Sequence, residues 1–501
     1  MKKRPEKRPS LLLSFIPLLV MVILLFFTIS IFGSDALEGG SQVVLLTTTA
    51  VCSLIAIGVC GIEWKHIEET IAGNIKGVGT ALILLLLIGA LSGTWMVSGV
   101  VPTLICYGLK IIHPTFFLAS TCLICALVAV MTGSSWTTIA TIGVALMGIG
   151  HAQGFGSGWI AGAIISGAYF GDKISPLSDT TVLASSSTGT PLFTHIRYMM
   201  MTTIPSFILA VAIFLVAGFA HTGDSSPEQI AVYAETLRST FRISPWLLLV
   251  PLATGVMIAR RTPSIITLFL SALLAGLFAL LFQPELVAAI GGAPRLGFMS
   301  GMKGIMVAFY GRTAIETGNP ELNELVATNG MTGMLNTVWL ILCAMCFGGA
   351  MQGSGMLTAI TRFFQRFMRR TLSVVSSTVF SGIFFNICTA DQYLSIILTG
   401  RIFRDVYEKK GYESRLLSRT TEDSVTVTSV LIPWNSCGMT QATVLGVSTL
   451  TYLPYCFFNL ISPLMSILFA ALGYKIYRTV GPHAAPADTP DATTDTPAAD
   501  A

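Results

Sequence analysis

The chain has 501 residues, of which 53% are hydrophobic and 11% are charged, and its formal net charge is +4. Soluble domains carry about 25% charged residues, so this composition excludes a water-soluble globular protein and indicates one that crosses a membrane many times. The positive excess accompanies a basic leader over residues 1–10, and no folded basic domain follows that would hold a nucleic acid, so no nucleic-acid partner is expected.

Ten apolar runs reach the length of about 20 residues that a bilayer-spanning helix needs. In chain order they cover residues 11–33, 41–62, 78–100, 114–131, 195–220, 244–260, 263–283, 333–356, 372–388 and 446–474. Shorter stretches at 132–150, 157–184 and 418–440 are interrupted by Gly, Ser and Thr and fit broken helices or re-entrant hairpins. We therefore expect ten to thirteen membrane segments.

The first apolar run is longer than the core of a signal peptide, so we expect a retained helix with a cytoplasmic N-terminus. An N-terminal membrane half then covers residues 11–220, and connecting helices and loops cover 221–330. A C-terminal membrane half covers 331–478. The tail over 479–501 is rich in Ala, Pro, Thr and Asp and is expected to be disordered.

The two halves carry a weak internal repeat. Residues 93–99 match 349–355 in spacing, residues 132–138 correspond to 389–395, and an acidic stretch follows in each half. Duplicated halves with matching interruptions are typical of transporters whose site lies at the centre of the membrane.

Basic residues indicate that the halves are inverted. The segment after residue 99 carries one Lys, whereas the segment after residue 355 carries four Arg, so the first end faces out and the second faces in. The Lys- and Arg-rich segment 401–419 disagrees, since the same crossing count leaves it outside. Either the count errs there or this segment is an amphipathic helix along the interface.

Each acidic stretch interrupts an otherwise apolar sequence. Residues 171–181 read Gly-Asp-Lys-Ile-Ser-Pro-Leu-Ser-Asp-Thr-Thr, and residues 420–429 read Thr-Thr-Glu-Asp-Ser-Val-Thr-Val-Thr-Ser. A carboxylate at membrane depth costs about 2.5–3.5 kcal/mol on insertion scales, so it survives chiefly where it lines a pathway or is paired. Hydroxyls and the carbonyls of unwound helix can replace the water around a small cation. The stretches therefore predict a cation site.

The candidate ion-binding residues are carboxylates, hydroxyls and one amide from these stretches and from the turn at 389–395. They are Asp172, Ser175, Ser178, Asp179, Thr180, Thr389, Asp391, Glu422, Asp423, Thr426 and Asn435, with Lys173 and Arg419 as charge partners. A proton and Na⁺ can compete for one buried carboxylate, and such competition suffices for obligatory exchange. We hypothesise that one of the five acids binds either H⁺ or Na⁺ and that reorientation carries whichever is bound.

Structural interpretations of the same residues remain open. Lys173 can neutralise Asp172 or Asp179 as a structural pair. The acids of the second stretch follow two arginines and can belong to a solvated loop mouth. Asp391 is harder to explain in this way because apolar residues flank it on both sides.

Residues 166–181 resemble the signature of the NhaC family of Na⁺/H⁺ antiporters, and so do residues 417–429 with the following 431–438. Asn386 and the sequence Ala-Asp-Gln-Tyr-Leu at 390–394 are also similar to that family. The resemblance implies an all-α polytopic membrane protein with inverted repeats, re-entrant hairpins and broken helices. It also implies an elevator-type scaffold and transport domain, which would extrude Na⁺ against entering protons across the bacterial inner membrane.

The predicted function is therefore secondary Na⁺/H⁺ antiport, with Na⁺, H⁺ and the lipid bilayer as partners, a homodimer as a further expected assembly, and no cofactor. Transporters that resemble this family also exchange organic acids such as malate and lactate, or amino acids. The Ser-rich run at 185–187 departs from the family pattern and keeps this alternative open. An enzyme is disfavoured because the sequence has no H-E-x-x-H or G-x-S-x-G motif, and the absence of a P-loop disfavours a nucleotide-driven pump.

Overall fold

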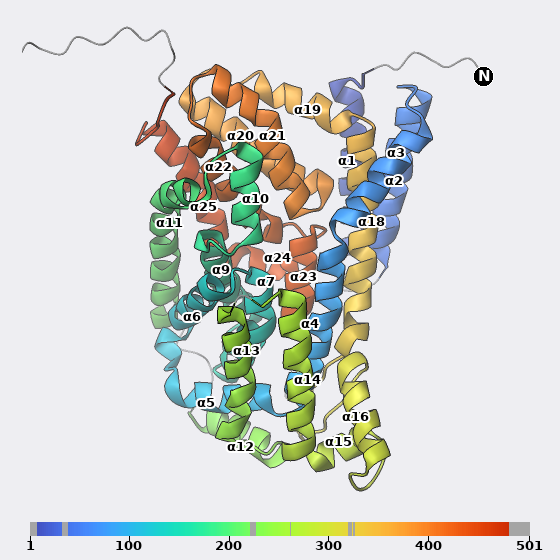
Figure 1. The fold of residues 1–501 in the computed structure, drawn as a ribbon, viewed down its shortest axis with the longest axis vertical. Coiled ribbons are helices and arrows are strands. Elements are labelled where there is room, and N and C mark those ends of the chain that lie inside the picture. The colour runs from blue at the N-terminus through green and yellow to red at the C-terminus, as the bar shows by residue number, and fades with distance from the viewer. Residues whose placement is uncertain are drawn as a thin grey trace, which may run out of the picture.

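The computed structural model describes residues 8–32, 39–220, 227–260, 262–318, 323 and 326–479. Residues 1–7 of the predicted leader and residues 480–501 of the predicted tail lie outside this part of the chain. Within it, the regular structure consists of helices, which Figure 1 shows packed side by side along one long axis.

Eight helical stretches of the described residues are long and apolar enough to cross a membrane, and two bent helix pairs raise this number to ten. The eight are α1 (Leu11–Phe32), α2 (Gly40–Gly58), α4 (Gly79–Val97), Pro114–Thr132 containing α6, α11 (Leu192–Ala220), α14 (Ser264–Phe282), Gly330–Gly353 containing α18, and α20 (Thr371–Thr389). The bent pairs are Gln229–Thr240 with Pro245–Ala259 and Thr449–Tyr455 with Phe457–Ala471. These stretches confirm all ten predicted apolar runs as helical.

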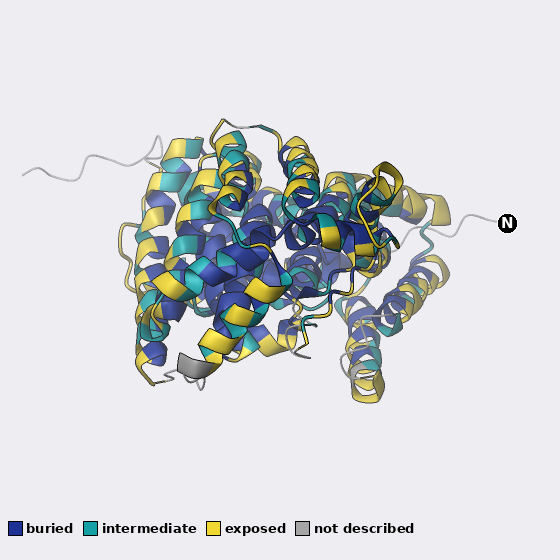
Figure 2. Cartoon of the chain, turned by 90° about the horizontal axis from the view of Figure 1, so that it is seen from below, coloured by how far each residue is buried: buried dark blue, intermediate teal, exposed yellow. Residues whose placement is uncertain are grey.

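The compound stretches and bent pairs contain η5 (Gly330–Met334), α18 (Leu335–Gly353), α12 (Pro227–Thr240), α13 (Leu249–Ala259), α24 (Thr449–Tyr452) and α25 (Phe457–Ala471). Shorter helices connect or cover these stretches, and they include α3 (Trp64–Gly77), α5 (Val100–Ile111), α15 (Pro284–Ile290), α16 (Phe298–Tyr310) and α19 (Met356–Gln365). Figure 2 shows the buried residues concentrated in the middle of the bundle, whereas α1, α2 and α3 stand at its edge.

One re-entrant hairpin belongs to the first half. Helix α6 (Phe117–Thr132) turns at Gly133, whose φ is 65°, into a second arm built from α7 (Ser135–Thr138), η3 (Ile139–Gly143) and α8 (Val144–Ala152). The far ends of the two arms meet again, because the Gln153 amide donates to the Ile112 carbonyl at 2.8 Å and the Phe117 and Phe155 rings stack at 5.2 Å. The chain therefore enters the bundle and returns to the same end.

The second half repeats this hairpin from the opposite end of the molecule. Helices α20 and α21 (Gln392–Lys409) are joined through Ala390, whose φ is 55°, and their far ends meet where the Thr371 hydroxyl bonds to Tyr412 at 2.8 Å. The Gln365 amide of α19 reaches the Ile402 carbonyl of α21 at 3.5 Å.

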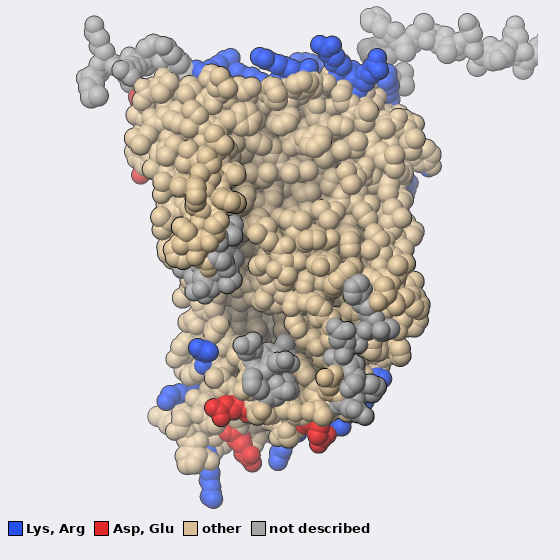
Figure 3. Space-filling model, turned by 180° about the vertical axis from the view of Figure 1, so that it is seen from behind, with Lys and Arg blue, Asp and Glu red and all other residues tan. Residues whose placement is uncertain are grey.

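This second hairpin resolves the disagreement over residues 401–419. The predicted crossing count was wrong there, because α20 and α21 fold back on each other instead of crossing in succession. The basic segment therefore lies at the same end as α19 (Figure 1). Figure 3 shows Lys and Arg side chains along that edge of the molecule. The exposed basic residues of α19, α21 and the segment between α19 and α20 are Arg362, Arg366, Arg369, Arg370, Arg401, Arg404, Lys409 and Lys410.

The two acidic stretches lie at helix breaks and not at the tips of the re-entrant hairpins. In the first half, α9 (Ser157–Ile174) and α10 (Asp179–Thr188) are separated by four residues. In the second half, α22 (Ser414–Thr421) continues through the π-helical turn η6 (Glu422–Thr426) and the 3-10 turn η7 (Ser429–Leu431) to α23 (Ser436–Leu445). Most residues of α9 and of the segment from α22 to α23 are buried, whereas α10 has an exposed face (Figure 1).

Candidate functional site

Glycines of α9 let it approach α6 closely, and this packing sets the position of the first break. A Cβ at Gly167 would collide with the Cys122 carbonyl, and one at Gly171 would collide with the Ala126 carbonyl. Small residues are the usual means by which membrane helices bring their backbones together. Since Asp172 follows directly, its carboxylate is delivered to the tip of the α6–α7 hairpin.

Asp172 is buried and holds the start of α7. One carboxylate oxygen accepts the backbone N–H of Ser135 at 3.0 Å and its hydroxyl at 2.7 Å. A negative charge is stabilised at a helix N-terminus, where backbone N–H groups are unpaired and the helix dipole is positive. Ser178, the N-cap of α10, lies beside the same carboxylate and hydrogen bonds to Thr180 at 2.9 Å.

The second break exposes consecutive backbone carbonyls, and three carboxamide side chains satisfy them. Asn386 of α20 donates to the Val425 carbonyl at 2.7 Å, Gln392 of α21 donates to that of Thr426 at 2.9 Å, and Asn459 of α25 donates to that of Val427 at 2.8 Å. A π-turn releases carbonyls from the regular helical ladder, and a buried carbonyl without a partner is costly. The carboxamides therefore hold η6 in its irregular form.

Asp423 forms the centre of a buried ion-pair network between the two breaks. Its carboxylate accepts from the Lys173 ammonium at 2.5 Å and from the Thr202 hydroxyl at 2.7 Å, and the Arg419 Nε lies 3.9 Å away. Lys173 also donates to the Ser462 hydroxyl at 2.9 Å. Of the interpretations left open for Lys173, pairing with an aspartate of its own stretch is not found, since the end of α9 directs its side chain across to Asp423 of η6.

Of the four buried acids in the described part of the chain, Glu422 is the one whose carboxylate accepts the fewest hydrogen bonds. The Thr180 hydroxyl donates to one of its carboxylate oxygens at 3.2 Å, and the other oxygen has no hydrogen-bond partner among the described residues. Charged side chains that interact electrostatically with it are Lys173, which already bonds to Asp423, and Asp172. Thr426 lies beside it, one turn further along η6.

Asp391 supports the second re-entrant hairpin. Its side chain caps α21 by accepting the Leu394 N–H at 2.8 Å, and its other oxygen accepts from the Ser436 hydroxyl at 3.3 Å. The Thr389 hydroxyl bonds to the Asp391 carbonyl at 3.0 Å and so closes the turn. Asn435 caps α23 and donates to the Asn386 carbonyl at 3.1 Å.

Two of the predicted site residues, Asp179 and Ser175, form none of the hydrogen bonds described for these buried carboxylates, although Asp179 lies near Asp172. Asp179, at the start of α10, is exposed. The Ser175 hydroxyl donates to the Val130 carbonyl at 2.8 Å and so fastens the first break to α6. The remaining candidates gather between the two breaks or at the second hairpin tip.

Several residues of this centre were not predicted from the sequence. They are Thr202, Gln392, Asn459 and Ser462. Thr202, Asn459 and Ser462 are polar side chains within apolar runs, which is a usable but unspecific signal, whereas Gln392 follows such a run. Their targets, a π-turn and an ion pair between two halves, depend on tertiary structure.

The buried charges of the described residues are unbalanced. Four carboxylates (Asp172, Asp391, Glu422 and Asp423) and two cations (Lys173 and Arg419) are the charged side chains with less than 9% exposure there. The centre thus holds two more acids than cations. Within the described ranges, no group of three or more His, Cys, Asp and Glu side chains is arranged to hold a metal ion.

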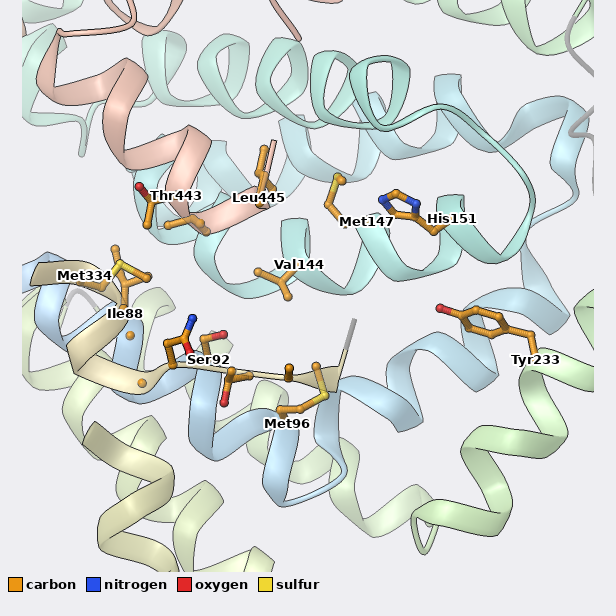
Figure 4. Close-up of a pocket in the computed structure, with 18 residues that line it drawn as sticks. Ile88, Ser92, Met96, Val144, Met147, His151, Tyr233, Met334, Thr443 and Leu445 are labelled. Atoms are coloured by element: carbon orange, nitrogen blue, oxygen red, sulfur yellow. The ribbon is translucent and has the colours of Figure 1, made fainter. Parts of the chain in front are cut away.

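A cavity of about 600 Å³ lies between α4, α8, α12, η5 and the end of α23. Figure 4 shows Met147 and His151 of α8 on one side, with Ser92 and Met96 of α4 opposite them. None of the described residues that line it is Lys, Arg, Asp or Glu. Because Tyr233 of α12 contributes, the cavity lies toward the end of the molecule opposite the basic α19 edge (Figure 1).

Two re-entrant hairpins, two broken helices and a buried surplus of acids define a membrane transporter with an ionic centre. A sequence profile of the Na⁺/H⁺ antiporter family matches residues 9–188 and 167–474. The chain therefore belongs to the NhaC-type Na⁺/H⁺ antiporter family and is a transporter and not an enzyme.

The names of individual relatives refer to different transported substrates. The chain is 38% identical to the Na⁺/H⁺ antiporter NhaC of Alkalihalophilus pseudofirmus over 434 residues, which cover 85% of this chain and 90% of that protein. It is 35% identical to the malate-2H⁺/Na⁺-lactate antiporter of Bacillus subtilis over 440 residues, covering 87% and 90%. The solved YdaH transporter of Alcanivorax borkumensis aligns with a TM-score of 0.40 at 11% identity, covering 91% of this chain and 99% of that one.

Proposed function

We propose that this protein exchanges Na⁺ for H⁺ at the buried centre between its two helix breaks. The observation that carries the proposal is the surplus of two acids over cations among the buried charged side chains of the described residues. An unneutralised charge is costly in a water-poor interior, so such a centre takes up a proton or a metal cation. Because either ion restores neutrality, the two compete, and this competition couples their movements.

Glu422 is the proposed exchanging group. Asp423 is neutralised by Lys173, whereas Asp172 and Asp391 are stabilised by backbone N–H groups of helix starts. Glu422 has one hydroxyl donor and one oxygen without a partner among the described residues. A hard cation prefers oxygen ligands, and Glu422 together with Asp172, Ser178, Thr180 and Thr426 offers them.

The proposal includes transport by movement of one part of the protein against another. The hairpins and broken helices form a moving transport domain, and α1, α2, α4 and α18 form the scaffold. With basic residues on the cytoplasmic side, the α19 edge faces the cytoplasm of a bacterial inner membrane and the cavity faces outward. Protons then arrive from the side on which the cavity lies. Homodimer formation stays a prediction.

Proteoliposome flux tests the exchange. Vesicles holding the protein and an imposed pH gradient should lose that gradient when Na⁺ is added. Glu422→Gln should abolish the Na⁺-dependent signal, whereas Asp179→Asn, which changes an exposed acid, should retain it. Normal Na⁺-dependent exchange by Glu422→Gln would remove this residue from the proposed site.

Exchange of small organic acids is the second candidate. The cavity of about 600 Å³ is larger than an ion needs and falls within the range of about 300–1,000 Å³ found for small-molecule sites. The relative named for malate and lactate is nearly as similar to this chain as the one named for Na⁺ and H⁺. Malate or lactate inside the vesicles should then be required for Na⁺-dependent flux, and flux without any organic acid would favour simple Na⁺/H⁺ exchange.

A further inference from the structure

Helix α23 connects the cavity with the buried centre. Val444 and Leu445, at its C-terminal end, line the cavity, and Ser436, at its N-terminal end, hydrogen bonds to Asp391. Figure 4 shows Leu445 and Thr443 at the part of the cavity away from Tyr233. Since an α-helix rises 1.5 Å per residue, the ten residues of α23 bridge about 15 Å between these places.

One face of α23 carries polar side chains between the two ends. Residues four apart lie on the same face of a helix, so Leu445, Gln441 and Cys437 form a line that leads inward from the cavity. Gln441 is fully buried, and neither its amide oxygen nor its amide nitrogen has a hydrogen-bond partner among the described residues. An orphaned carboxamide in a close-packed interior is costly, so a structural role alone does not account for it.

The line continues to the proposed exchanging acid through a series of polar contacts. The Cys437 thiol lies 3.1 Å from the Gln392 amide oxygen, and the Gln392 amide nitrogen donates to the Thr426 carbonyl at 2.9 Å. Thr426 lies beside Glu422. Polar groups thus extend from the floor of the cavity to Glu422 along α23, α21 and η6.

We propose that this face of α23 is the proton route between the cavity and Glu422, and that Gln441 is its positioning residue. The Gln441 amide both donates and accepts, so it can hold single water molecules in a hydrogen-bonded file. Hydronium in the cavity passes a proton into this file and becomes water. Each water of the file accepts one proton and passes another on, so that it ends as water, and the last transfer protonates the Glu422 carboxylate. Gln441 and Cys437 are buried without exposed surface, which suits single waters and not a hydrated Na⁺ ion.

Substitution at Gln441 tests the route. The inference itself rests on the proposed exchange at Glu422. Gln441→Leu should slow Na⁺-dependent proton flux about tenfold or more while Na⁺ still raises the thermal stability of the purified protein, because the site itself is intact. Gln441→Asn keeps an amide and should restore most of the rate. Thr440→Val is the matched control, since its hydroxyl is already bonded within α23 to the Ser436 carbonyl at 2.6 Å.

A rate for Gln441→Leu within about twofold of the parent would overturn the route. If Glu422→Gln also exchanged normally, the proposed function would fail with it, whereas loss of exchange in Glu422→Gln alone would remove only the route.

Oxidation of Cys437 gives a second test that does not depend on folding of a variant. Hydrogen peroxide, a neutral oxidant close to water in size, should oxidise the Cys437 thiol of the unaltered protein as water enters along α23, as mass spectrometry of the cysteine peptides would report. Cys125 is equally buried but lies on α6 away from this face and should remain unmodified. Resistance of Cys437 equal to that of Cys125 would contradict a hydrated route.

Discussion

The two helix breaks have the same architecture but different chemistry. Helices α10 and α23 each follow a capping residue, Ser178 or Asn435, and each ends at a left-handed glycine, Gly189 or Gly446. The two caps and the two glycines are separated by the same number of residues, so they define one register between the halves. When the two halves are aligned in this register, Asp172 of the first half corresponds to Ser429 of the second. The acids of the two halves therefore do not occupy equivalent positions.

The difference shows how a duplicated fold becomes an asymmetric site. The first break is a compact four-residue turn, and the end of α9 before it contributes Asp172 and the Lys173 ammonium. The second is unwound over η6 and η7, depends on carboxamides from three other helices, and contributes Glu422 and Asp423 next to Arg419 of α22. Each break thus carries one buried cation, but the first carries one buried acid and the second carries two.

The largest expected effect comes from separating the two breaks at their ion pair. Lys173→Met leaves Asp423 as a buried charge without its main partner and should lower the free energy of unfolding by about 3–5 kcal/mol. Arg404→Met breaks an exposed pair with Glu408 and should cost less than about 1 kcal/mol. Chemical or thermal unfolding in detergent measures both, and equal losses would contradict the central role of the buried pair.

A smaller effect should show that the second break depends more on other helices than the first. Gln392→Leu leaves the Thr426 carbonyl buried without a donor and should cost about 1–3 kcal/mol. Ser175→Ala removes a partly buried hydrogen bond to the Val130 carbonyl and should cost about 0.5–1.5 kcal/mol. The same unfolding assay ranks the pair, and a reversed order would mean that the first break is the more dependent one.

The smallest effect distinguishes the tips of the two re-entrant hairpins. Both tips need a left-handed residue, which the first half supplies as Gly133 and the second as Ala390. Ala390→Gly removes strain of about 1–2 kcal/mol but increases unfolded-chain entropy, so it should stabilise by about 1 kcal/mol at most. Gly133→Ala should instead destabilise, because a Cβ there would lie 2.7 Å from the Leu177 backbone. Stabilisation by both changes would contradict this account of the tips.

Much of the fold could be predicted because the membrane imposes simple rules on sequence. Apolar length predicted the ten helical runs, and Gly, Ser and Thr clusters predicted where helices break. The return of α21 to the side of α19 could not be predicted from hydropathy, since α20 is as long and apolar as a spanning helix. Only the tertiary contacts between α19, α20 and α21 reveal the hairpin.

The candidate site was predictable to the level of residue type but not of role. Acids within apolar sequence indicated Asp172, Asp391, Glu422 and Asp423 as interior residues, and the structure buries all four. Their roles depend on which donor lies opposite, and the sequence left the partner of Lys173 open between several acids, of which the structure pairs it with Asp423. Asp179 lies in the same motif as Asp172, yet the first turn of α10 directs it to the surface.

Proton release upon Na⁺ binding is the most direct measure of competition at Glu422. Purified protein in weakly buffered detergent solution should acidify the medium when Na⁺ is added, because the arriving cation displaces a proton from that carboxyl group. The release should disappear in Glu422→Gln and persist in Asp179→Asn. Undiminished release from Glu422→Gln would contradict the claim that this buried acid holds either H⁺ or Na⁺.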